Sequence, residues 1–421
     1  MKKLVIPSAL LLALALLLTL VPGCGGGGEE QSGTTPTPGT TPKATPTSTP
    51  QTKTLKMGLI ITLSGPAAPW GMQTEQGVEW AISRINAAGG VKAGADTYMV
   101  KLVKCDDKWI ASEGATCATK MVYDEKVHYV VGPINALDAL NPIMTAGKCF
   151  MGGITNADKE FTNPDAPYTW ITLQGYDQWV DTFWKQLSKV ETDIKTVGLI
   201  APITSYDQMT PSKAAVLKYF PGVEIVEAVT WVQGITDFYP LLTPIVAKNP
   251  DAIGMTDGGV GDQSLMIKQV RELGFKGTLV GSNFGDPGPG AAVAGNAAIE
   301  GFYQNEPDYS SDNYPQTTRA LYAEYQNLYP GAQFGLCQYL GYSAVYFYKQ
   351  AIEKAGSIDP DKVKTVLDDP NWTYEWFGMP GRSLGGLSTY GIKRTNQDEV
   401  CLSTTHDGKK VAISHEQVIV P

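Results

Sequence analysis

The chain has 421 residues, with 33 lysines and arginines against 42 aspartates and glutamates, which gives a net charge of −9. An acidic chain of this kind lacks the basic surface that nucleic acids or anionic lipid headgroups require, so neither is expected as a partner. Its length exceeds what a single hydrophobic core commonly serves, so we expect two globular units.

The start of the chain has the features of an export signal. Two lysines follow the first methionine, the stretch 4–21 is apolar, and 21–24 reads Val-Pro-Gly-Cys. A transmembrane anchor is the alternative, because about 18 apolar residues are close to spanning length. A small residue and a cysteine directly after the run favour a cleaved signal, 1–23, and a lipid on Cys24. We therefore expect a lipoprotein on the outer face of a cell membrane, held there by its lipid alone.

The next segment, 24–54, has the composition of a tether. Four glycines follow the cysteine, and the rest is rich in threonine and proline with almost nothing apolar. Such a segment cannot bury enough apolar surface to offset the entropy lost on folding. We expect it to hold the folded part of the chain away from the membrane.

Strands and helices alternate from Leu55 onward. The run 57–62 is continuously apolar, which is typical of a strand covered on both faces. Apolar residues then recur at helical spacing from about Gly71, and Gly89-Gly90 ends that helix. Repetition of this order predicts parallel sheets with right-handed crossovers. Further strands are expected at 99–104, 128–132, 149–152, 169–173, 196–201, 224–229, 251–256, 278–280, 400–405 and 411–414. Further helices are expected at 110–123, 137–146, 176–190, 210–220, 238–248, 262–273, 314–328, 335–355 and 360–368.

Five cysteines remain when the lipidated one is set aside, and an odd number leaves at least one free. Cys105 ends a predicted strand and Cys117 lies on the next helix, close enough for a loop-closing disulfide. Cys337 and Cys401 are a second candidate pair, which would leave Cys149 free in a strand. The cysteines lack CxxC spacing and the histidines are scattered, so no metal and no cofactor are expected.

A resemblance to a known family rests on five pieces of sequence. The chain contains, in this order, LSGPAAPWG, INAAGGV, LVKCDD, VHYVVGP and LGYSAVYFYKQAIEKAGSID. From about Leu55 to its end it resembles the solute-binding receptors of ABC importers, in the branched-chain amino acid and amide branch. The resemblance implies an α/β, two-lobe type I periplasmic-binding-protein fold. Each lobe would be a mainly parallel sheet flanked by helices, with three chain crossings as a hinge. Lobe 1 would be 55–174 plus 305–380 and lobe 2 would be 175–304 plus 381–421, closing on a ligand.

The resemblance also implies a ligand site. Trp70 matches the aromatic residue that follows the SGP turn in amino acid receptors of this family. Gly153 matches a backbone contact and Thr155 a hydroxyl contact to the ligand carboxylate. Tyr206 matches the tyrosine that the second lobe adds. Free N–H groups at helix starts and strand ends suit such an anionic oxygen.

Three positions depart from the family. Ala136, beside Asn135, stands where a helix-start serine is usual, and Gly259 where a second-lobe aromatic residue is usual. Asn283 stands in place of the acid that pairs with the ligand's ammonium, and an uncompensated buried charge costs about 2–5 kcal/mol. Three aspartates on neighbouring loops could replace that acid: Asp257, Asp262 and Asp286. Gly259 also leaves more room than leucine or valine would fill. We therefore expect a small amide, a urea-like compound or a carboxylate rather than a standard branched-chain amino acid.

The sequence holds no HExxH or Walker motif, and the pair Asp106-Asp107 is typical of a loop end or helix cap. We expect a non-enzymatic, monomeric receptor that captures a small polar solute and delivers it to ABC permease subunits. A soluble ligand sensor on the same fold stays open, and an enzyme is the less favoured third class.

Overall fold

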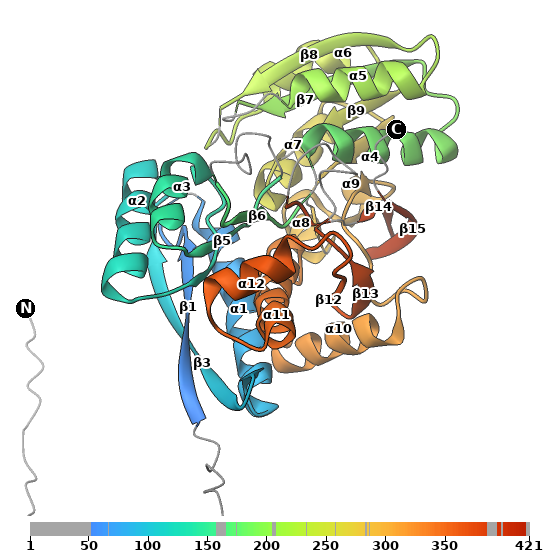
Figure 1. Ribbon diagram of the computed structural model, residues 1–421. Helices are drawn as coiled ribbons and strands as arrows, with labels where there is room; N and C mark the ends of the chain where they lie inside the picture. Colours follow the sequence, from blue (N-terminus) through green and yellow to red (C-terminus); the bar gives the residue numbers. More distant parts are fainter. Residues whose placement is uncertain are drawn as a thin grey trace, which may run out of the picture. The chain divides into compact units, whose positions relative to one another are not determined.

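Two large sheets, each flanked by helices, organise the part of the chain that the computed structural model describes (Figure 1). The predicted α/β class is therefore confirmed. The described residues are 52–65, 67–156, 166–173, 175–203, 208–232, 234–256, 258–282, 284–285, 287–384, 394–396 and 399–417. Cys24 and the predicted export signal lie outside them. Within the described residues, no helix is long and apolar enough to cross a membrane.

The first sheet has six strands in the order β2-β3-β1-β4-β5-β6. They are β1 (Thr52–Ile61), β2 (Val91–Ala93), β3 (Asp96–Asp106), β4 (Tyr129–Val131), β5 (Phe150–Gly153) and β6 (Thr169–Ile171). All neighbours run parallel except β2 and β3, which pair antiparallel. Every residue of β4, β5 and β6 is buried, which explains their continuous apolar runs.

The start of β1 corrects the predicted tether 24–54. Thr52, Lys53 and Thr54 already pair with the 97–99 segment of β3. Lys53 and Thr54 are exposed, so their polar side chains do not show in the apolar pattern that predicts the strand. The folded part of the chain therefore begins earlier than its first apolar run.

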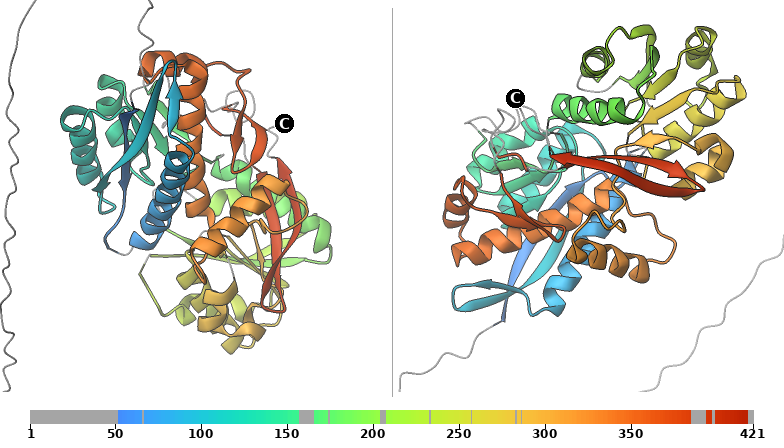
Figure 2. Two further views of the ribbon diagram at one scale, coloured as in Figure 1. Left: turned by 90° about the horizontal axis from the view of Figure 1, so that it is seen from below. Right: turned by 90° about the vertical axis from the view of Figure 1, so that its right-hand side faces the viewer.

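Helices α1 and α11 lie side by side against the first sheet (Figure 2). Two glycines permit the close approach of the two backbones. A Cβ on Gly77 of α1 would lie 2.2 Å from the carbonyl oxygen of Gln338, and one on Gly341 of α11 would lie 2.4 Å from that of Thr74. The helices that accompany the first sheet are α1 (Ala68–Ala87), α2 (Ala111–Thr119), the π-helical η1 (Lys120–Asp124), α3 (Leu137–Ala146), α10 (Gln316–Leu328), α11 (Leu336–Ala355) and α12 (Pro360–Leu367).

The second sheet has seven strands in the order β15-β14-β11-β10-β9-β7-β8. They are β7 (Thr196–Pro202), β8 (Glu224–Trp231), β9 (Ala252–Met255), β10 (Thr278–Gly281), β11 (Tyr303–Gln304), β14 (Glu399–His406) and β15 (Lys409–Gln417). Strands β7, β8, β9, β10 and β11 run parallel to their neighbours in this group. Strand β14 pairs antiparallel with β11, and β15 pairs antiparallel with β14. A separate hairpin pairs β12 (Tyr374–Trp376) with β13 (Met379–Arg382).

The helices that accompany the second sheet are α4 (Tyr176–Val190), α5 (Met209–Tyr219), α6 (Tyr239–Ala247), α7 (Val260–Glu272), α8 (Pro287–Ala294) and α9 (Asn296–Ile299). The last two were not predicted. The sequence of α8 is PGPGAAVA, and glycine and proline are the weakest helix formers. Tertiary packing, with Pro287 and Gly290 buried, holds this segment helical in spite of its composition.

The chain passes between the two sheets after β6, after β11 and before β14. Ahead of the last passage, Thr395 forms a parallel bridge with Ile171 of β6. Asn396 donates from its backbone N–H to the Ile171 carbonyl at 2.9 Å. The lobe boundaries expected from the sequence stay a prediction, and this pairing favours a first lobe that continues to Asn396 rather than ending near 380.

Candidate ligand-binding site

Trp70 lies in the first turn of α1, at the carboxyl edge of the first sheet and half-buried. The next residue has to be glycine, because a Cβ on Gly71 would lie 1.7 Å from the carbonyl oxygen of Thr62. This glycine lets α1 begin directly on the end of β1. The indole is thus presented at the edge where ligands bind in open α/β sheets.

Trp109, which the sequence did not single out, packs against Trp70. The two ring centroids are 5.8 Å apart and the ring planes make an angle of 43°. We call Trp70 and Trp109 the tryptophan pair. Asn135, one of the predicted site residues, donates from Nδ2 to the Trp109 carbonyl at 3.4 Å, so the structure brings these three residues together.

Ala136 caps α3 in a left-handed conformation, with φ 56° and ψ 32°. Gly153 ends β5, and a Cβ there would lie 2.5 Å from Cδ2 of Leu137 in the first turn of α3. Its carbonyl accepts hydrogen bonds from the backbone N–H of Thr172 at 3.0 Å and from the hydroxyl at 2.9 Å. Glycine at 153 is therefore required for α3 to begin against the end of β5.

Thr155 follows two residues after Gly153 and is half-buried. The strand end before it is fixed by a hydrogen bond of 2.9 Å from the N–H of Ile154 to the carbonyl of Pro133. Its own hydroxyl forms no hydrogen bond with any residue that the structure describes. The hydroxyl is therefore free to bond a ligand oxygen, as the resemblance implies.

Gly259 brings the second sheet to the tryptophan pair. It is the N-cap of α7, which follows β9, with φ −64° and ψ 165°. A Cβ on Gly259 would lie 3.6 Å from Cζ2 of Trp70 and 3.5 Å from Oδ2 of Asp262. The room expected at Gly259 thus borders the Trp70 ring, and its use by a ligand stays a prediction.

Asp262 is the described member of the three aspartates considered above. It lies in the first turn of α7 and is half-buried. Burial raises the pKa of this carboxyl, and a hydrogen bond from the backbone N–H of Gly259 opposes the rise. No cationic side chain among the described residues acts to lower the pKa of Asp262. The carboxylate can therefore accept hydrogen bonds from a ligand beside Trp70.

Gln333, between α10 and α11, meets the second sheet at another point. Its Nε2 lies 3.5 Å from the carbonyl of Phe284, and a Cβ on Gly285 would lie 2.1 Å from the same nitrogen. Gly285 has φ 74°, a left-handed conformation that also favours glycine. Sequence patterns gave no sign of this contact, because it joins segments far apart in the chain.

Four residues named from the sequence lie outside the described residues: Tyr206, Asp257, Asn283 and Asp286. The predicted disulfide between Cys105 and Cys117 is formed, whereas Cys337 and Cys401, the second candidate pair, are not joined by a disulfide. Cys149 forms no disulfide either, and it is buried. In the described part of the chain, no group of three or more histidine, cysteine, aspartate or glutamate side chains could hold a metal ion.

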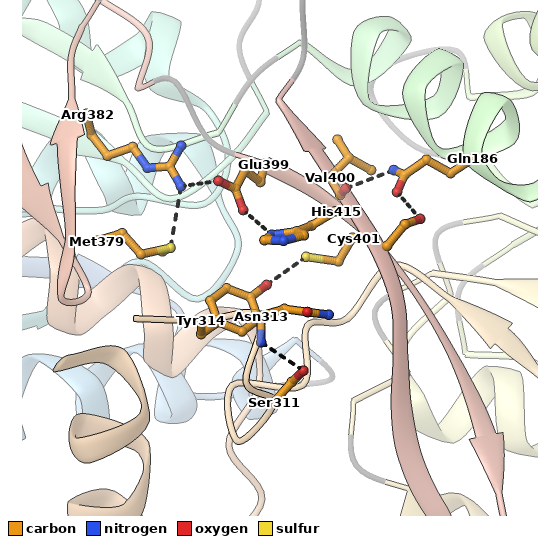
Figure 3. A network of polar contacts seen from close by, with 11 residues as sticks. Gln186, Ser311, Asn313, Tyr314, Met379, Arg382, Glu399, Val400, Cys401 and His415 are labelled. Atoms are coloured by element: carbon orange, nitrogen blue, oxygen red, sulfur yellow. Dashed lines mark hydrogen bonds and ion pairs between the residues drawn. The ribbon is translucent and has the colours of Figure 1, made fainter. Parts of the chain in front are cut away.

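A polar network lies where the chain passes into β14 (Figure 3). Glu399 accepts from Arg382 Nη2 at 2.8 Å and bonds His415 Nδ1 at 2.6 Å. Burial acts to raise the pKa of Glu399, but Arg382 and His415 outweigh it and hold the pKa below its usual value. The network thus joins the β13 hairpin to β14 and β15 of the second sheet.

Comparison with known proteins places this fold in a family. The family model "Periplasmic binding protein" matches residues 54–384, more than half of the chain. The chain therefore belongs to the periplasmic binding protein family. It is similar to the "Leu/Ile/Val-binding protein BraC3" of Rhizobium johnstonii, with 27% identity over 321 residues that cover 75% of this chain and 83% of that protein.

Solved structures show the same architecture. The substrate binding protein LivJ of Streptococcus pneumoniae, in complex with isoleucine, has a TM-score of 0.73 at 22% identity and covers 87% of this chain and 100% of its own. A solute binding protein from Rhodopseudomonas palustris BisB5, in complex with 3,4-dihydroxy benzoic acid, has a TM-score of 0.71 at 20% identity, covering 87% and 98%. The predicted two-lobe type I periplasmic-binding-protein fold is confirmed by these likenesses.

Proposed function

We propose that the protein captures a small polar solute outside the cytoplasm and delivers it to the permease subunits of an ABC importer. Membership of the periplasmic binding protein family supports this role, as do relatives described as binding leucine, isoleucine and valine. The observation that carries the proposal is the meeting of Trp70 from the first sheet with Gly259 and Asp262 from the second. A solute that contacts all three touches both lobes at once.

Such a solute shifts an equilibrium between open and closed lobes. A ligand can favour the closed form only as far as it binds that form better, so contacts to both lobes are required. We place Thr155, Asn135 and the start of α3 at Ala136 on the first-lobe side of the ligand. Tyr206, Asp257 and Asn283 remain the expected contacts from the second lobe, together with Gly259 and Asp262.

The ligand should present N–H donors to Asp262. A half-buried carboxylate with one backbone hydrogen bond gains from a further donor, and an anionic group beside it would be repelled. Small amides and urea-like compounds satisfy this requirement, and so does an amine. A carboxylate group on the same ligand would bind at the Thr155 end. An amino acid carries both an amine and a carboxylate, so Asp262 makes such a ligand compatible with the site, and the screen decides between amino acids and amides.

The lipid on Cys24 would hold a monomer at the membrane while the tether lets it reach the permease. Cys24→Ser should release the protein from the membrane fraction into the soluble extracytoplasmic fraction. Retention of Cys24→Ser in the membrane after an alkaline wash would contradict lipid anchoring.

A thermal-shift screen, followed by calorimetry, tests the proposed capture. The panel comprises the twenty amino acids, acetamide, benzamide, urea, benzoate and short aliphatic carboxylates. We expect at least one amide, urea-like or amine-bearing compound to bind in the micromolar range or tighter, with unchanged chemical identity by mass spectrometry. Conversion of a bound compound into product would favour an enzyme. Failure of every compound to bind would contradict the proposed capture.

A further inference from the structure

Trp109 sits in a loop whose backbone is held in an uncommon conformation. Lys108 and Trp109 have φ angles of 53° and 64°, so two consecutive non-glycine residues are left-handed. Such residues cost free energy and persist only where the surroundings fix them. The loop that carries Trp109 is therefore specified by its neighbours.

Two carboxylates at the end of β3 fix this loop. Asp106 Oδ1 accepts from the N–H groups of Leu63 at 2.8 Å and Lys108 at 2.9 Å. Asp107, which is 2% exposed, accepts at Oδ1 from the N–H of Trp109 at 3.0 Å and from the hydroxyl of Thr62. The loop is thus bonded to the segment that leads from β1 toward Trp70. The Asp106-Asp107 pair, which the sequence indicates only as a loop end, has this positioning role.

A disulfide and an amide secure the two sides of the same loop. Cys105 at the end of β3 is bonded to Cys117 on α2, with a Cα–Cα distance of 5.7 Å. Asn135, ahead of α3, donates to the carbonyl of Trp109. Three elements of the first lobe therefore converge to present one half-buried indole beside Trp70.

We propose that Trp109 is a specificity-determining residue, which together with Trp70 selects ligands that carry an aromatic ring. The tryptophan pair has a centroid distance of 5.8 Å, within the 4.5–7 Å range of favourable ring contacts, and both indoles are half-buried rather than fully covered. Gly259, where a Cβ would lie 3.6 Å from Cζ2 of Trp70, adds no side chain against that ring. The inference rests on the proposed function, and it extends that function by naming ligands with an aromatic ring as the preferred class.

Matched pairs of planar and saturated compounds test this selection. The probes are benzamide with cyclohexanecarboxamide, benzoate with cyclohexanecarboxylate, and phenylalanine with cyclohexylalanine, measured by calorimetry on the full-length protein. In at least one pair, we expect the planar member to bind about three- to tenfold tighter than its saturated partner. Trp109→Leu should remove this preference, and Trp109→Phe should keep most of it. Tyr123→Leu, which changes a 49% exposed aromatic residue on η1, is the matched control and should leave the preference unchanged.

Melting temperatures separate a folding defect from a loss of selection. Trp109→Leu should melt within about 3 °C of the parent. If Trp109→Leu is unfolded, Trp109→Phe is used instead, because that variant keeps an aromatic ring. Its ratio of affinities for the planar and the saturated member of each pair should then stay close to that of the parent. Equal binding of planar and saturated members by the parent overturns the inference, as does an equal loss for both members in Trp109→Leu. Binding of none of the six probes also overturns it, whereas capture of another solute would leave the proposed function standing.

Discussion

Trp70 in the first turn of α1 lies against Gly259 at the N-cap of α7, with 3.6 Å between Cζ2 of the indole and the position that a Cβ on Gly259 would take. Trp70 follows β1 of the first sheet, and Gly259 follows β9 of the second. At 3.6 Å, the methyl group of an alanine at 259 would make an ordinary van der Waals contact with the ring. The backbone conformation at 259 suits any residue, so alanine would cause no strain. A larger side chain would occupy the space of the ring.

The first prediction concerns that space. Gly259→Ala should keep the affinity of the tightest solute from the screen within about twofold, while Gly259→Leu should lower it by about tenfold or more, because leucine displaces Trp70. Calorimetry on both variants measures this. Unchanged affinity in Gly259→Leu would show that Trp70 does not lie against Gly259 in the bound form.

The second prediction concerns Thr155, whose hydroxyl forms no hydrogen bond with the described residues. Thr155→Val should weaken binding by about one to two decades, because a hydrogen bond to a charged group contributes roughly 1.5–3 kcal/mol. Thr155→Ser, the matched control, should retain most of the affinity. Parent-like binding by Thr155→Val would exclude this hydroxyl from the site.

The third prediction uses the pH dependence of Asp262. Burial raises its pKa in the folded protein, so the folded state holds this proton to a higher pH than the unfolded chain does. The carboxyl therefore lowers stability as the pH rises from its unfolded pKa of about 3.8 through its folded pKa. Asparagine at 262 does not titrate. Between pH 4 and pH 7, the free energy of unfolding of ligand-free Asp262→Asn should therefore fall less than that of the parent.

The same variant should bind N–H-donating ligands more weakly, because a neutral amide in place of the carboxylate no longer offers a negative charge. Urea denaturation across pH and calorimetry at pH 7 give the two readouts. If the free energy of unfolding changes with pH identically in parent and variant, the raised pKa of Asp262 is contradicted. Undiminished affinity for the amide, urea-like or amine-bearing solute would contradict the role of Asp262 in binding.

The fourth prediction concerns the contact of Arg382 with Glu399. The pKa of Glu399 in the folded protein is held below its usual value of 4.5. The ionised Glu399 therefore contributes its full stability to the fold above pH 4.5, and this contribution is lost as the pH falls through the folded pKa. Glu399→Gln should destabilise the protein at pH 7 by about 3 kcal/mol, because it removes the carboxylate that pairs with the buried Arg382. The difference from the parent should shrink toward pH 3. A difference that is independent of pH would contradict the ionised pair.

The apolar pattern predicted most of the strands because buried parallel strands carry continuous apolar runs, as 196–201 does in β7. It did not predict α8, whose PGPGAAVA sequence opposes a helix, or the polar start of β1 at Thr52. In these places tertiary contacts outweigh local preference.

The site shows the same division. The resemblance picked out Trp70, Gly153 and Thr155, which lie at strand ends and a helix start of the first sheet. Trp109 escaped notice because its role depends on a left-handed loop and on a contact with Trp70, neither of which leaves a periodic signal. The contact between Trp70 and the Gly259 position escaped notice for the same reason, since the ring comes from a distant segment.

Closure of the two lobes on a solute is measured most directly by small-angle X-ray scattering, with and without the tightest solute from the screen. Trp70→Ala at the same solute concentration serves as the control, because it removes an aromatic contact between the lobes. We expect the radius of gyration of the parent to fall on binding, and that of Trp70→Ala to fall less. A radius of gyration that stays constant while calorimetry shows the solute fully bound would contradict capture by closing lobes.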